Sequence, residues 1–144
     1  MRALWTRIGL AYIAAGFALV GFWAAFAPRS FYTDFPGAGR HWISPDGPYN
    51  QHLIRDVGEL NLALAVVVIA AAVTLSLPLV RAALAATLVN GVLHVVYHVG
   101  HTDMFSTGDQ VAIIGSLVLA PVVALVLLVM VRSGSEPAAV TGSV

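Results

Sequence analysis

Four long apolar runs, each almost free of charged residues, constrain this chain more than any other feature of its sequence. They cover about residues 8–27, 57–78, 82–100 and 110–131. Each is close to the roughly 20 residues that a helix needs to cross about 30 Å of hydrocarbon. A lone strand cannot satisfy its backbone hydrogen bonds in lipid, so each run is expected to be a helix. The sequence therefore predicts an all-α fold, a four-helix transmembrane bundle with both termini on the same side.

The composition agrees with a protein dissolved in lipid. Apolar residues make up 59% of the 144-residue chain and charged residues only 10%, whereas a soluble domain carries about 25% charged residues. A soluble chain this short could not hide so much apolar surface. The net charge is zero and lysine is absent, so no clustered basic face for nucleic acid is expected. Cysteine is also absent, which excludes disulfides and thiolate metal sites.

A single membrane domain is expected over residues 1–132, with a long outer loop at 28–54 and a disordered tail at 133–144. Pro78 and Arg81 indicate a very short turn between the second and third spans. The second and third spans are therefore expected to form a tight antiparallel hairpin.

Arginine residues near the span ends indicate the orientation. One side receives Arg2, Arg7, Arg81 and Arg132, and the other receives Arg29, Arg40 and Arg55. Because cytoplasmic segments next to spans carry an excess of basic residues, we expect both termini in the cytoplasm. The chain is thus predicted to be a multi-pass protein of the cell membrane whose long loop faces outward.

Two further features predict contacts with the surroundings. Ala11, Ala15 and Ala18 share one stripe of the first span, and small residues let helices approach closely in lipid, so a homo-oligomer or a partner helix is expected there. The outer loop is rich in aromatic residues, namely Phe31, Tyr32, Phe35, Trp42 and Tyr49. They fit either an aromatic belt at the headgroups or a lid over the mouth of the bundle.

Most ionisable residues other than arginine gather on the outer side of this predicted topology. All five histidines and six of the seven acidic residues are there: His41, His52, His94, His98, His101, Asp34, Asp46, Asp56, Glu59, Asp103 and Asp109. Ionisable groups within the membrane are costly and usually mark functional sites. A functional site is therefore expected at the outer end of the bundle.

Two polar stripes stand out at that end. At about 100° per residue, five polar residues of the third span fall within one sector of the helix, and these are Asn90, His94, Tyr97, His98 and His101. His52, Asp56 and Glu59 form a stripe on the second span. If the turn is centred near residues 79 and 80, Glu59 lies level with the end of the third span. Both stripes are expected to face the bundle interior, with Glu59 beside the histidines.

Imidazole and carboxylate groups are ligands of zinc and iron, and histidines on successive turns of a helix can hold one ion together. The leading hypothesis is a site for one divalent transition metal, zinc or iron, acting on a lipophilic substrate as a Lewis acid or by activating water. The predicted metal ligands are His94, His98, His101 and Glu59. The predicted catalytic residues are Glu59, Asp56 and Tyr97, and the surrounding residues are His52, Asn90, Asp103 and Asp109.

Two other classes of function stay open. A metal-free enzyme of the isomerase or cyclase type could use Glu59 or Asp56 to protonate an isoprenoid-like lipid, with a histidine as relay. A non-enzymatic membrane subunit or assembly factor would use the polar stripes for packing and the alanine stripe for docking. The sequence alone does not decide whether the protein is an enzyme.

Three resemblances bear on these hypotheses. The string His94-x-x-x-His98-x-x-His101 is similar to the histidine boxes of membrane fatty-acid desaturases and hydroxylases, but those families carry several boxes and this chain has one. Membrane b-type cytochromes are also four-helix bundles, but they need axial histidines on facing helices, so haem is not expected. The segment from Gly39-Arg40-His41-Trp42 through Tyr49-Asn50 to Arg55-Asp56-Val57-Gly58-Glu59 resembles small, uncharacterised four-helix membrane proteins of high-GC bacteria. That resemblance implies no activity.

Overall fold

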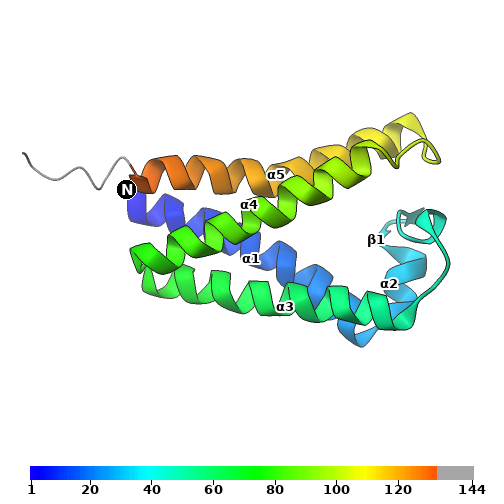
Figure 1. Cartoon of the computed structure of the whole chain (residues 1–144), viewed down its shortest axis with the longest axis horizontal. Helices are drawn as coiled ribbons and strands as arrows, with labels where there is room; N and C mark the ends of the chain where they lie inside the picture. Colours follow the sequence, from blue (N-terminus) through cyan, green and yellow to red (C-terminus); the bar gives the residue numbers. More distant parts are fainter. Residues whose placement is uncertain (133–144) are drawn as a thin grey trace, which may run out of the picture.

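The computed structural model describes residues 1–132 and is almost entirely helical. Four helices are long and apolar enough to cross a membrane: α1 (Arg2–Phe26), α3 (Gln51–Thr74), α4 (Leu77–Val99) and α5 (Thr107–Arg132). Helix α1 begins and helix α5 ends at the same end of the bundle (Figure 1). The prediction of a four-helix membrane bundle is confirmed. The predicted disordered tail, 133–144, lies outside the described residues.

The four helices associate as two antiparallel pairs, α1 with α3 and α4 with α5 (Figure 1). The first pair is the closer one because glycines let the two backbones touch. A Cβ atom added to Gly58 would meet the backbone of Ala25, and one added to Gly21 would lie 2.9 Å from the backbone nitrogen of Leu62. In the second pair, a Cβ atom at Gly91 would lie 3.0 Å from the ring of Pro121.

The main core lies in the half of the bundle where the chain ends of α1 and α5 meet. Its twelve buried residues come from all four long helices: Leu10, Ile13, Ala14, Phe17, Ala65, Val68, Ala71, Val80, Ala83, Leu84, Ala124 and Leu127. A smaller cluster at the other end, around Ala24, Phe31 and Ile54, takes its buried residues from α1, α2 and α3 only. Beyond Thr87, no residue of α4 is buried. The two pairs are therefore joined by a shared core in one half only.

The predicted loop at 28–54 contains several short elements of secondary structure. It forms α2 (Pro28–Asp34), a hairpin of β1 (Pro36–Gly37) and β2 (Arg40–His41), the 3-10 turn η1 (Ser44–Asp46) and the first turn of α3. Positive φ angles at Ala38 (55°) and Gly39 (75°) shape the hairpin turn. Phe31 is buried, and the other four loop aromatics are half-buried. The loop therefore packs on protein, which favours the lid interpretation over a simple belt.

The turn between α3 and α4 is at Leu75 and Ser76, about four residues earlier than predicted. Leu75 ends α3 with a left-handed conformation (φ 51°), and Pro78 lies in the first turn of α4. Proline is favoured there because that turn leaves its N–H groups unpaired anyway. The predicted second span shifts accordingly, from 57–78 to Gln51–Thr74. Glu59 then lies level with Val92 instead of the end of α4.

The start of α5 agrees with its sequence signal. The Ser106 hydroxyl accepts from the Asp109 backbone N–H and donates to the Asp109 carboxylate.

The alanine stripe of α1 lies where a partner could reach it. Ala11 and Ala15 are exposed and line a shallow apolar groove of about 320 Å³ between α1 and α3. A homo-oligomer through this face stays a prediction.

Candidate functional site

The histidines of α4 begin the site. His94 and His98 are one turn apart, so their side chains lie over the same strip of the helix. Their Nε2 atoms are 3.0 Å apart, and their ring centroids are 4.8 Å apart. Two protonated nitrogens would repel at this distance. The two Nε2 atoms must therefore share one proton or bind the same cation through their lone pairs.

His98 carries an unsatisfied atom. Among the described residues, its Nδ1 is the one buried side-chain nitrogen or oxygen without a hydrogen-bond partner. A buried polar atom left unpaired costs about 1–3 kcal/mol. In native proteins such an atom usually has a water molecule or an ion as its partner. His98 therefore has unmet hydrogen-bonding capacity at Nδ1, the ring nitrogen that does not contact His94.

Tyr97 connects the helix to the loop. Its hydroxyl donates to the Asp46 carboxylate, with both oxygens at 3.2 Å. His101, just beyond the end of α4, stacks on the Tyr97 ring with centroids 4.1 Å apart. The Nδ1–H of His101 donates to the Tyr97 carbonyl oxygen at 2.7 Å. The sequence predicted that the polar stripe runs on to His101. In the structure the His101 ring stacks on Tyr97, beside the histidine pair.

A second set of contacts centres on Asp109, at the start of α5. Its Oδ1 accepts from the guanidinium of Arg40 at 2.7 Å and from the indole N–H of Trp42 at 3.0 Å. These two residues belong to the β-hairpin and the segment that follows it. Asp109 thus fastens the loop to the α4–α5 pair, just as Asp46 does through Tyr97.

The acidic residues of α3 are not part of either set. Asp56 pairs with His52 on its own helix, with 3.4 Å between Nε2 and Oδ2. Glu59 is exposed, and within residues 1–132 it forms no ion pair or hydrogen bond with the histidines of α4. In residues 1–132, no three His, Asp or Glu side chains lie close enough to hold a metal ion together. The predicted ligand set of His94, His98, His101 and Glu59 is therefore not gathered at one point.

The physical reason is the shape of the bundle. The prediction that the two stripes meet assumes that α3 and α4 stay side by side along their whole length from the turn. In the structure these helices diverge with distance from their turn (Figure 1). The remaining predicted residues of the surrounding shell, Asn90 and Asp103, are exposed.

Sequence reasoning missed Asp46, Arg40 and Trp42 as members of the site. In the sequence, Asp46 is only one of several acidic residues on the predicted outer side. No local pattern signals that a loop carboxylate will reach a tyrosine 51 residues later in the chain. Only the tertiary structure brings these groups together.

Comparisons with protein-family models, with curated proteins and with solved structures give no match to this chain. The chemistry of the site is therefore argued from its own residues. Two imidazoles, a phenol and a carboxylate lie at the outer end of one helix. This set can bind a cation, move a proton or contact a polar group of a ligand.

Proposed function

We propose that this multi-pass membrane protein binds one divalent transition metal at its outer end, through Nε2 of His94 and Nε2 of His98. The observation that carries the proposal is the 3.0 Å separation of these two nitrogens on successive turns of α4. Histidine pairs with this spacing supply two of the ligands in helical metal sites.

The distance also bears on the kind of ion. Metal–nitrogen bonds are about 2.0–2.1 Å long, so two nitrogens 3.0 Å apart subtend roughly 90° at a shared ion. That angle suits neighbouring positions of an octahedral ion such as iron(II). A tetrahedral zinc ion would require the nitrogens to move apart by about 0.3 Å, which a small rotation of either ring supplies.

Neighbouring groups could complete the coordination. Asp46 is a candidate carboxylate ligand, since it accepts from Tyr97, whose ring packs edge-on against that of His98 with centroids 5.3 Å apart. The Nδ1–H of His101 is held by a backbone carbonyl, the tautomer that leaves Nε2 free in metal-ligating histidines. Glu59 and Asp56 have no place in this version of the site.

The position of the pair supports a lipophilic substrate. His94 lies five residues before the end of α4 at Val99, which is about 7.5 Å along the helix. The pair therefore lies near the end of a helix that is long and apolar enough to cross a membrane. His94 is exposed, and so are its neighbours Val92, Leu93 and Val96. A lipid-soluble molecule bearing a polar oxygen could therefore approach the ion from the bilayer.

The test is the metal content of the detergent-purified protein, by mass spectrometry, for the native chain and two double variants. His94→Ala/His98→Ala removes the pair, and His41→Ala/His52→Ala removes two histidines from the same end without touching it. We expect a near-stoichiometric transition metal in the native protein and in the control, and its loss in the first variant. No metal in any of them after reconstitution, or equal loss in both variants, would contradict the proposal.

A metal-free acid–base function is the second candidate, and the Tyr97–Asp46 hydrogen bond favours it. A phenol held by a carboxylate, beside a histidine pair that shares one proton, forms a short path for proton transfer. Chelation separates the two candidates. An activity on a lipid that survives complete chelation, and is lost in Tyr97→Phe, would favour the acid–base function.

A further inference from the structure

The end of the bundle opposite the histidines is basic. Arg2, Arg7, Arg81 and Arg132 all lie there, on α1, α4 and α5. All six acidic residues within the described part of the chain lie at the other end, in the loops or at the outer ends of helices. The electrostatic potential at the arginine end is therefore positive, and it favours anionic groups.

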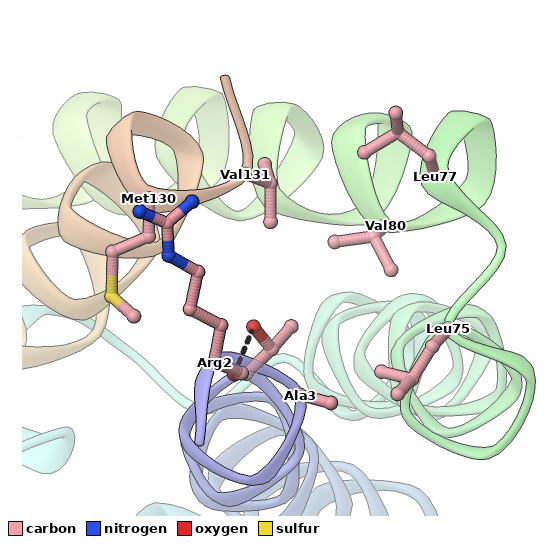
Figure 2. Close-up of a pocket in the computed structure, with 8 residues that line it drawn as sticks. Arg2, Ala3, Leu75, Leu77, Val80, Met130 and Val131 are labelled. Atoms are coloured by element: carbon pink, nitrogen blue, oxygen red, sulfur yellow. Dashed lines mark hydrogen bonds between the residues drawn. The ribbon is translucent and has the colours of Figure 1, made fainter. Parts of the chain in front are cut away.

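A cavity of about 260 Å³ opens at this end, where the start of α1, the α3–α4 turn and the end of α5 converge. It is lined by Arg2, Ala3, Thr6, Leu75, Leu77, Val80, Met130 and Val131. Figure 2 shows Arg2 extending from α1 toward Met130, with Leu75, Val80 and Val131 around the space beside it. The walls are thus apolar, and one guanidinium lies at their edge.

The two polar side chains of the lining, Thr6 and Arg2, differ in whether their hydrogen-bond donors are already used. The Thr6 hydroxyl donates to the Arg2 carbonyl oxygen at 3.0 Å, so it is already used within α1. The guanidinium of Arg2 makes no hydrogen bond or ion pair with any side chain of residues 1–132. It keeps a full set of donors in the fork geometry that matches a phosphate. Arg2 is therefore the group that would select a ligand.

We propose that this cavity binds an anionic phospholipid of the surrounding bilayer. Its phosphate would lie on the Arg2 guanidinium, which can donate two parallel hydrogen bonds to it. The first carbons of an acyl chain would contact Val80, Leu75 and Met130, because dry apolar cavities take apolar ligands. Basic pockets between transmembrane helices recognise anionic headgroups in this way. A free phosphate ion would leave the apolar walls unused.

The experiment measures lipid retained by the detergent-purified full chain, by native mass spectrometry, after incubation with equal amounts of phosphatidylglycerol and phosphatidylcholine. We expect preferential retention of phosphatidylglycerol. Arg2→Gln should lower that retention roughly 10-fold or more, the effect of losing charge-assisted hydrogen bonds. Arg132→Gln is the matched control, because it removes the same charge from the same end without touching the cavity lining. It should change retention only slightly.

A second variant tests the cavity and not the charge. Ala3→Phe, at an exposed position on the rim, should fill the space and lower retention while all arginines remain. Three results would each overturn the proposal: equal losses in Arg2→Gln and Arg132→Gln, equal retention of both lipids by the native protein, or displacement of the lipid by inorganic phosphate at matched concentration. The histidine double variant should leave lipid retention unchanged, so this test is independent of the metal proposal.

Discussion

At the scale of single residues, the end of the bundle that carries the histidines is held together by two carboxylates. Asp109 accepts from Arg40 and Trp42, and Asp46 accepts from Tyr97. Both contacts join the loop to the α4–α5 pair, in the half of the bundle that lacks a shared apolar core. The loop therefore depends on these polar links to stay over the histidines.

Asp109→Ala should release the β-hairpin from α5. We expect trypsin to cut after Arg40 several-fold faster in this variant, because cleavage requires local opening of the segment and the Arg40 ion pair is gone. Asp103→Ala is the control, since Asp103 is an exposed acid nearby that has no hydrogen bond or ion pair through its side chain with any of residues 1–132. The measurement is the rate of appearance of the fragment on mass spectrometry. Equal rates in both variants would show that Asp109 does not fasten the loop.

At the scale of helices, the α1–α3 pair depends on close backbone approach. Helices in lipid gain little from apolar burial, so their association rests on packing that small residues allow. Gly58 faces the backbone of Ala25, which cannot move aside as a side chain could. Gly16, by contrast, has open space where a side chain would be.

Gly58→Ala should therefore destabilise the protein by about 1–3 kcal/mol, the usual cost of overpacking. Gly16→Ala makes the same change on α1 and should be neutral or slightly stabilising. The measurement is the unfolding free energy in mixed micelles as the denaturing detergent is increased. A Gly58→Ala protein as stable as Gly16→Ala would mean that α1 and α3 are further apart than described.

At the scale of the whole molecule, four spans require that consecutive connections alternate between the two sides of the membrane. The loop after α2 and the α4–α5 connection belong to one end of the bundle, and the α3–α4 turn belongs to the other (Figure 1). Arginine distribution predicts that the first two face outward.

Single cysteines test this arrangement cleanly because the native chain has none. Pro48→Cys and Met104→Cys should react with a membrane-impermeant thiol reagent added outside intact cells, and Ser76→Cys should react only after permeabilisation. All three positions are exposed in the structure. Reaction of Ser76→Cys alone from outside would invert the predicted orientation, and reaction of all three from one side would contradict the four-span topology.

The sequence by itself determined the class of fold. Four apolar runs of membrane-spanning length leave a helical bundle as the only way to satisfy the backbone in lipid. It also identified His94 and His98 as neighbours, because residues four apart share a helix face whatever the tertiary structure is. Both conclusions rest on local geometry, and both agree with the structure.

Tertiary structure alone decided which groups meet across helices. The position of the turn depended on whether Pro78 ends one helix or begins the next. An error of about four residues there moved Glu59 along its neighbour by about eight residues, or roughly two turns. Divergence of the two helix pairs then kept Glu59 from the histidines, and the loop brought Asp46 to Tyr97 instead. Such contacts follow from the packing of whole helices, and no local pattern in the sequence predicts that packing.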